Sequence, residues 1–192
     1  MSGRNWLFAA MLALVSAPTA AAEAIYIVDP GHTYPSFEAD HMGMSLWRGK
    51  FNKTTGKVTL DKEAGKGDVE IVIDLDSIDF GHDELNGMMS GPKFFDTDKH
   101  PKATYKGKLA GFVDGAPTQV VGDLTLRGVT RPVTLKINSF KCMPHPMSKR
   151  DWCGADALAT INREEFGMDE GKAWGFDMDV VLRIQVEAEK AE

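Results

Sequence analysis

Two cysteines and five histidines are the residues of this 192-residue chain whose types could do metal or redox chemistry. Cys142 and Cys153 flank a short segment rich in proline and charge, and they could form a disulfide in an oxidising compartment. Closing a loop of about a dozen residues would stabilise the fold by about 3 kcal/mol. His145 lies between them, but the spacing lacks the fourth ligand and the paired arrangement of a zinc site. The sequence favours the disulfide over a metal site or free thiols.

The histidines are scattered along the chain: His32, His41, His82, His100 and His145. No two of them have the short spacing of a metal-binding pair. His41 continues the alternating face of Phe37 and Ala39 and would point with them toward the interior. Beside Ser45 and Trp47 it could hydrogen-bond the head group of a ligand. The alternative is a satisfied interior histidine.

Patterns for nucleophilic catalysis and for phosphate binding are absent from the sequence. There is no G-x-S-x-G elbow, no glycine-rich phosphate loop and no cysteine in a cationic helix-start context. The carboxylate pairs Asp74/Asp76 and Asp177/Asp179 alternate with apolar residues and would therefore face solvent. We expect no catalytic residue, no metal and no cofactor, and hence no enzyme.

The first 22 residues have the pattern of a secretory signal peptide. Arg4 precedes an apolar run over 6–15 that is too short to span a bilayer comfortably, and an A-x-A site follows at 20–22. Cleavage after Ala22 would leave one domain, residues 23–192, in an exported compartment. The alternative is an uncleaved membrane anchor.

The charge balance narrows the classes of partner. Residues 23–192 contain 21 basic and 28 acidic residues, a net charge of −7. Nucleic-acid binding needs a basic face, so no such partner is expected, and anionic lipid head groups are disfavoured as well. No later segment is apolar over the roughly 20 residues that a spanning helix needs, so we expect no stable membrane insertion.

The elements that must position these residues are predicted to be strands. Apolar residues recur with a period of two at 69–75, 124–126, 133–137 and 178–186. This pattern is typical of strands with one face buried and one face exposed to solvent. Turn-forming residues separate the runs. About eight short antiparallel strands, in a sandwich or a closed barrel, fit this pattern.

One segment, His82 to Gly91, breaks the alternation. Asp83 and Glu84 suit a first helical turn, where acidic side chains complement the helix dipole. Gly91-Pro92 would end that helix. We therefore predict one helical insertion near residues 82–91, capping one end of the β structure.

The stretch GDLTLRGVTRPVTLKI at 122–137 predicts a hairpin. Gly128 supplies the backbone freedom of a turn, which we place at 128–130. Arg127 and Arg131 would then flank the tip in solvent. The alternative is a pair of cations that grips an anionic head group.

Several motifs together identify the chain as similar to a known family. D-P-x-H-T at 29–33, F-x-A-x-H-M-G-x-S at 37–45 and G-x-F at 49–51 resemble the opening of the YceI-like family. K-F-F-D at 93–96 with H-P-K-A-T-Y at 100–105, the hairpin at 122–135 and D-A-x-A-T-I-N-R-x-x-F-G-M at 156–168 resemble its later segments in the same order. Pro35 departs from the family's pattern, since many members have Val or Ile there, and the Cys142/Cys153 loop occurs only in a subset.

The resemblance implies an all-β fold, an eight-stranded antiparallel up-and-down barrel of the lipocalin-like type. It implies a periplasmic, non-enzymatic carrier that holds a long apolar molecule, such as a polyisoprenoid, an isoprenoid quinone or a fatty lipid, along the barrel axis. It carries over no catalytic residue. A homodimer is left open.

The inward faces of the predicted strands suggest the residues that would line such a cavity. From the alternation we expect the walls to comprise Phe37, Ala39, His41, Trp47, Phe51, Ile71, Ile73, Leu124, Leu126, Leu135 and Ile161, with Met89, Phe94 and Phe95 as a cap. Large apolar side chains are as compatible with a packed core as with a pocket. Two alternatives therefore stand: a metal- or His-dependent periplasmic enzyme, and a ligand-free, stress-related interaction module with a filled barrel.

Overall fold

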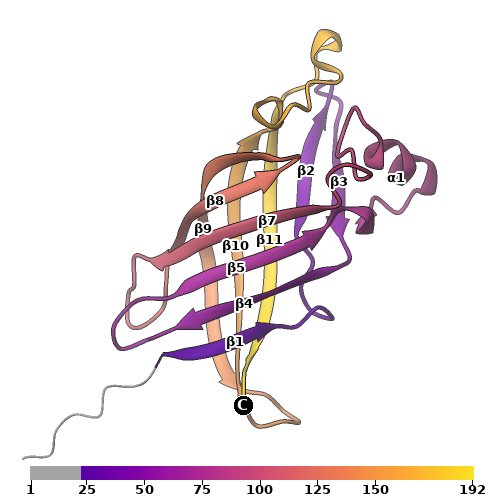
Figure 1. Ribbon diagram of the computed structural model, residues 1–192. Coiled ribbons are helices and arrows are strands. Elements are labelled where there is room, and N and C mark those ends of the chain that lie inside the picture. The colour runs from indigo at the N-terminus through magenta and orange to yellow at the C-terminus, as the bar shows by residue number, and fades with distance from the viewer. Residues whose placement is uncertain (1–22) are drawn as a thin grey trace, which may run out of the picture.

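The computed structural model describes residues 23–192, and the expected signal peptide over 1–22 lies outside the described residues. The regular structure of the described chain is mostly β-strand (Figure 1). Its strands are β1 (Ala24–Val28), β2 (Ser36–His41), β3 (Ser45–Phe51), β4 (Thr54–Leu60), β5 (Asp68–Asp74), β6 (Ile78–Asp79), β7 (Lys102–Ala110), β8 (Gln119–Leu126), β9 (Val129–Pro144), β10 (Asp151–Asn162) and β11 (Asp179–Lys190). The helical elements are η1 (Leu75–Ser77), α1 (Asp83–Ser90), η2 (Arg163–Phe166) and η3 (Lys172–Trp174).

Eight of the strands form a closed antiparallel ring. Their order is β1-β4-β5-β7-β8-β9-β10-β11, and β1 pairs with β11 to complete it. Neighbours in the ring follow each other along the chain apart from the insertions of β2, β3 and β6. The predicted eight-stranded up-and-down barrel is therefore confirmed.

The strands β2, β3 and β6 extend the wall at one end of the barrel. The long strand β11 pairs with β1 near Ala188 and with β2 around Leu182, so its two halves have different neighbours on the same side. The strand β3 then pairs with β2, and the short β6 pairs with β3. In Figure 1 these strands rise beside β11 at the end of the barrel that carries α1.

The interior is built from the alternation seen in the sequence. On β5, Val69 is buried and Ile71 and Ile73 are half-buried, whereas Asp68 and Glu70 on the other face are exposed. On β10 the inward positions hold small residues, among them Ala155 and Ala157, which leave room inside the ring. Apolar side chains on the covered face drive closure, and small ones keep the interior from filling.

The helix α1 occupies the predicted segment. His82 is its N-cap, and the His82 side chain accepts a hydrogen bond of 3.2 Å from the backbone N–H of Leu85. At the other end, the N–H of Gly91 donates to the carbonyl of Met88. Among residues 23–192, no helix is long and apolar enough to cross a membrane.

The turn between β8 and β9 differs from the prediction. It consists of Arg127 and Gly128 alone, both with positive φ (51° and 75°), and Leu126 faces Val129 across it. A two-residue turn with two positive φ angles matches the right-handed twist of the strands. The predicted placement at 128–130 was wrong because Val129 and Thr130 already belong to β9.

Candidate ligand-binding cavity

The barrel encloses a cavity of about 500 Å³ toward the end that carries α1. This volume lies within the range of ligand sites in proteins. Met88 and Trp174 line the cavity and are 51% and 67% exposed, so it reaches the surface at this end. We call this opening, between α1 and η3, the mouth.

The lining is predominantly apolar and contains most of the residues expected from the sequence. Thirteen of the fourteen line the cavity: Phe37, Ala39, Trp47, Phe51, Ile71, Ile73, Met89, Phe94, Phe95, Leu124, Leu126, Leu135 and Ile161. The structure thus brings these residues together around one space. That they contact a ligand stays a prediction.

His41 is the exception. It is half-buried and does not line the cavity; its ring stacks on Trp47, with centroids 4.2 Å apart and an interplanar angle of 10°. Phe176 meets the same imidazole edge-on at 5.0 Å. His41 therefore packs against Trp47, a residue of the wall, and a direct contact with a head group stays untested.

Several further residues that line the cavity were not expected from the sequence. They are Leu75, Phe80, Ala103, Tyr105, Val133, Met168, Val180, Leu182 and Ile184. Most of them belong to alternating runs that were recognised: Leu75 to 69–75, Val133 to 133–137, and Val180, Leu182 and Ile184 to 178–186. The period-two signal could have found these, and it could have found Ala103 and Tyr105 on β7, whereas Phe80 and Met168 lie outside regular strands and carry no such signal.

An aromatic cluster forms the wall beneath α1. The ring of Phe37 lies 5.5 Å from Phe80, 5.9 Å from Phe51 and 6.2 Å from Phe95. Gly49 makes this packing feasible, because a Cβ there would lie 2.6 Å from the Phe37 ring. Edge-to-face contacts of this kind favour fixed ring positions. This side of the cavity is therefore preformed.

The expected cap is present at the mouth. Phe95 is buried and Met89 and Phe94 are half-buried, and all three line the cavity. The N–H of Phe95 donates a 2.9 Å hydrogen bond to the carbonyl of Met89, which holds the segment after α1 against the helix.

Charged side chains among the lining residues gather at the mouth. Lys93 pairs with Glu170 at 3.1 Å. The half-buried guanidinium of Arg163 donates to the carbonyl oxygens of Met168 and Glu170, and burial lowers the pKa of Arg163. These groups sit at the entrance rather than in the depth of the cavity, where the walls are apolar. The arrangement suits a molecule with a long apolar tail and a polar end.

Arg127 does not stand free in solvent, contrary to prediction. It is half-buried, and its guanidinium donates to the carbonyl oxygens of Pro92 and Gly167. Arg131 is exposed as predicted and reaches only the carbonyl of Thr130. Pairing with two backbone carbonyls makes Arg127 a structural tie at the mouth.

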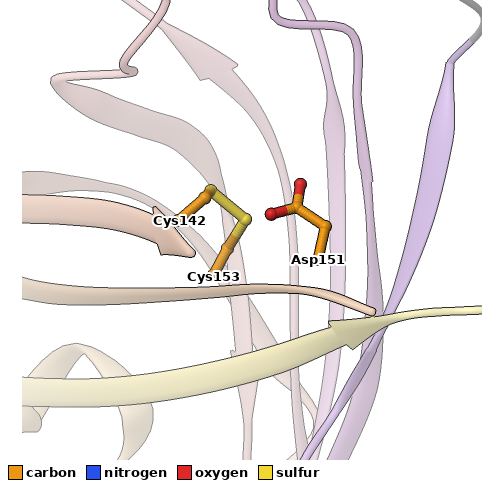
Figure 2. Close-up of side chains that lie close together, drawn as sticks. All are labelled: Cys142, Asp151 and Cys153. Atoms are coloured by element: carbon orange, nitrogen blue, oxygen red, sulfur yellow. A yellow bond between two sulfur atoms is a disulfide. The ribbon is translucent and has the colours of Figure 1, made fainter. Parts of the chain in front are cut away.

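Cys142 and Cys153 form a disulfide across paired positions of β9 and β10, which confirms the predicted pairing (Figure 2). In the described part of the chain, the one group of side chains close enough to hold a metal adds Asp151 to these cysteines. The sulfurs are bonded to each other, and Asp151 accepts hydrogen bonds from Tyr26 (2.7 Å) and Lys62 (3.0 Å). The three residues that could ligate a metal are therefore engaged with other partners: the two sulfurs with each other, and the Asp151 carboxylate with Tyr26 and Lys62. This group fits a structural role.

The carboxyl of Asp151 is stabilised as an anion. Burial on its own would raise the pKa of Asp151, but the hydrogen bonds from Tyr26 and Lys62 outweigh it and hold that pKa below its ordinary value. His145 points elsewhere: its Nδ1 accepts from the backbone N–H groups of Met147 and Ser148. The proposed Cys–His–Cys metal arrangement is therefore not assembled.

Comparison with known proteins agrees with this geometry. The model of the YceI-like domain family matches residues 26–188. A UPF0312 protein of Vibrio parahaemolyticus is 34% identical over 134 residues, which cover 68% of this chain and 71% of that protein. A UPF0312 protein of Pseudomonas aeruginosa is 32% identical over 186 residues, covering 93% and 95%.

Solved structures share the fold. BcnA of Burkholderia cenocepacia superimposes with a TM-score of 0.68 at 21% identity, covering 84% of this chain and 99% of that chain. The YceI protein of Campylobacter jejuni gives 0.66 at 19% identity, with coverage of 80% and 90%. A polyisoprenoid binding domain from Saccharophagus degradans gives 0.60 at 18% identity, with coverage of 88% and 100%. With the family model matched from the first strand of the barrel to the last, this chain belongs to the YceI-like domain family.

Proposed function

We propose that this protein is a non-enzymatic periplasmic carrier that holds the long apolar chain of a polyisoprenoid, an isoprenoid quinone or a fatty lipid. The observation that carries the proposal is the apolar cavity of about 500 Å³ that reaches the surface at one end of the barrel. The polyisoprenoid-binding description of the Saccharophagus degradans domain, which has the same fold, supports it.

The mechanism is burial. Each methylene group that leaves water for an apolar wall contributes about 0.8 kcal/mol, so a chain of many carbons binds without any bond being made or broken. The aromatic cluster around Phe37 holds its wall in place before the ligand arrives, which reduces the entropic cost of binding. A barrel filled by its own side chains would have no such space, so the cavity favours a carrier over a ligand-free interaction module.

The periplasmic location rests on two features of the chain. Residues 1–22 have the pattern of a secretory signal, and Cys142 and Cys153 are joined in a disulfide. Disulfides persist in the periplasm and are rare in the cytosol. Both features support export.

The test is mass spectrometry of an organic extract of the protein purified from the periplasm without detergent. We expect a long-chain isoprenoid or lipid in stoichiometric amount. A matched pair of variants controls for adventitious lipid: Ala39→Trp adds an indole inside the cavity, whereas Val121→Trp adds it on the exposed outer face of β8.

We expect Ala39→Trp to lose the extracted molecule and Val121→Trp to retain it, with both variants showing the circular dichroism of the parent protein. An empty extract from the parent, combined with no retention of added quinone or polyprenol, would contradict the carrier function. Equal retention by both variants would place the lipid outside the barrel and contradict it as well.

A further inference from the structure

The barrel contains a second, smaller cavity of about 110 Å³ toward the disulfide end. Tyr26, Leu60, Cys153 and Ala155 are among its lining residues. The first three belong to a buried apolar cluster, together with Ala188, that is distinct from the main core. The interior of the barrel is therefore divided in two, and the large cavity, which we call the upper chamber, does not extend to the disulfide end.

One layer of side chains lies between the two spaces. Five residues line both of them: Pro35, Ile71, Tyr105, Leu135 and Ile184. Four come from the ring strands β5, β7, β9 and β11, of which β5 and β7 are neighbours while β7, β9 and β11 alternate, and Pro35 immediately precedes β2. Inward side chains from alternate strands commonly form the layers that fill a barrel. We call these five residues the dividing layer.

Tyr105 is the polar member of this layer, and its hydroxyl contacts backbone carbonyls of the next two strands, β8 and β9. It is 6% exposed, and its oxygen lies 2.9 Å from the carbonyl oxygen of Val133 and 3.1 Å from that of Val120. Val120 lies on the neighbouring strand β8 and Val133 on the strand after it, β9, where it faces Gly122 of β8. Burial raises the pKa of Tyr105, so the phenol keeps the proton that it donates.

The neighbouring strand supports the ring of Tyr105 from the other side. Ile71 on β5 faces Tyr105 directly in the ladder and lines both cavities with it. Hydrogen bonds at one end of the side chain and a cross-strand apolar neighbour at the other restrict its rotation. Tyr105 is thus a fixed barrier, unlike the unbranched methionines at the mouth.

We propose that the dividing layer, with Tyr105 at its centre, is the length stop of the upper chamber and sets the longest chain that the protein covers completely. The proposal rests on the carrier function given above. A tail entering from the mouth fills the chamber until its end meets Tyr105. Any further carbons remain outside, where they gain little because they stay in contact with water.

The test measures the affinity of the delipidated protein for straight-chain primary alcohols of increasing length, by fluorescence of the two tryptophans in the lining, Trp47 and Trp174. For the parent protein we expect Kd to fall by about fourfold per added methylene and then to level off at one chain length. In Tyr105→Ala, which joins the two cavities, we expect the levelling to move to longer chains by several methylenes. Tyr105→Phe keeps the aromatic ring, so its Kd should level off at the same chain length as in the parent protein.

A second-site variant makes the result specific to the lower cavity. Ala155 lines only that cavity, so Ala155→Leu fills it without entering the upper chamber. In Tyr105→Ala/Ala155→Leu, the chain length at which Kd levels off should return toward that of the parent protein. Ala155→Leu alone should leave this chain length unchanged. Leu135→Ala opens the same layer from β9 and replaces Tyr105→Ala should that variant not fold.

The outcomes separate the length stop from the carrier function. If folded Tyr105→Ala and Leu135→Ala bind the short alcohols but level off at the parent's chain length, the length stop is overturned and the carrier function stands. If the parent protein binds no alcohol of any length and retains no polyprenol, the carrier function itself fails.

Discussion

The guanidinium of Arg127 donates a hydrogen bond of 3.1 Å to the carbonyl oxygen of Pro92. A second nitrogen of the same guanidinium donates to the carbonyl of Gly167. One side chain at the tip of the β8–β9 hairpin thus joins the segment after α1 and the loop after η2. Three segments that are distant in sequence are held together at the mouth of the cavity.

Removing this tie should loosen the mouth without disturbing the turn. In Arg127→Gly the backbone keeps its positive φ without a side-chain penalty, while both hydrogen bonds are lost. We expect a loss of about 1 kcal/mol in the free energy of unfolding in urea, and faster amide exchange over residues 92–97. Arg131→Thr is the control, since Arg131 is exposed, donates only to the carbonyl of Thr130, and lies within β9, where threonine is well accommodated. Equal effects from the two variants would show that Arg127 ties nothing.

The disulfide should stabilise the fold without shaping the upper chamber. Cys142 and Cys153 lie in the parts of β9 and β10 that pair near Ala188 of β11, and neither lines the upper chamber. Figure 1 shows this end of β11, at the C-terminus, opposite the end of the barrel that carries α1. Replacing both by alanine should lower the free energy of unfolding by about 3 kcal/mol, because the unfolded chain gains the entropy of the opened loop. Chemical denaturation with and without reductant measures the loss. Affinity for an apolar chain, measured well below the unfolding midpoint, should stay as in the parent protein; a large loss of affinity would link the disulfide to the chamber.

The pair of Asp29 and His32 should make the fold respond to pH at two points. The hydrogen bond between them (2.7 Å) and their opposite charges raise the pKa of His32 and lower the pKa of Asp29. A raised histidine pKa contributes stability below its ordinary value of 6.5 and loses it as pH rises through the folded-state pKa. A lowered aspartate pKa contributes above its ordinary value of 3.8 and loses it as pH falls through the folded-state pKa.

The pair therefore contributes most between pH 3.8 and 6.5. Titration by NMR should give a midpoint above 6.5 for His32, and Asp29→Asn should move that midpoint down. An unchanged His32 midpoint in Asp29→Asn would refute the coupling.

His41 offers a test of whether an imidazole is needed for binding. Its ring stacks on Trp47, and an aromatic pair of this kind contributes about 0.5–1.5 kcal/mol. We expect His41→Phe to retain the affinity of the parent for an apolar chain, and His41→Ala to weaken it by about tenfold at most. If His41→Phe loses binding altogether while the barrel stays folded, the imidazole itself takes part, as the sequence analysis suggested. Elemental analysis of the parent protein tests the metal-dependent alternative in parallel.

The local pattern of the chain was sufficient for the strands and for the helix. Alternation of apolar residues with a period of two reports which face of a strand is covered, and this property is contained in the strand itself. Ile71, Ile73, Leu124 and Leu126 were placed in the lining on that basis, and all four line the cavity. The helix was predictable for a related reason, because Asp83 and Gly91 mark its ends locally.

Contacts between distant segments were beyond that reasoning. The alternation placed His41 on one face of the strand with Phe37, yet in the structure His41 stacks on Trp47 and does not line the cavity. Arg127 was expected in solvent because nothing in 122–137 indicates that Pro92 and Gly167 lie beside it. Such pairings depend on how the barrel closes, which is a property of the whole chain.

The sequence by itself determined the strands, their covered faces, the helical insertion and the membership of the family, because each of these depends on residue types at short spacing. Only the tertiary structure decided that the interior is hollow, where the hollow opens and where it ends. Whether inward side chains meet or leave a gap depends on the separation of strands across the ring, and no local pattern records that distance. The layer at Tyr105 is the clearest case: its five members come from five separate segments and meet only when the barrel is closed.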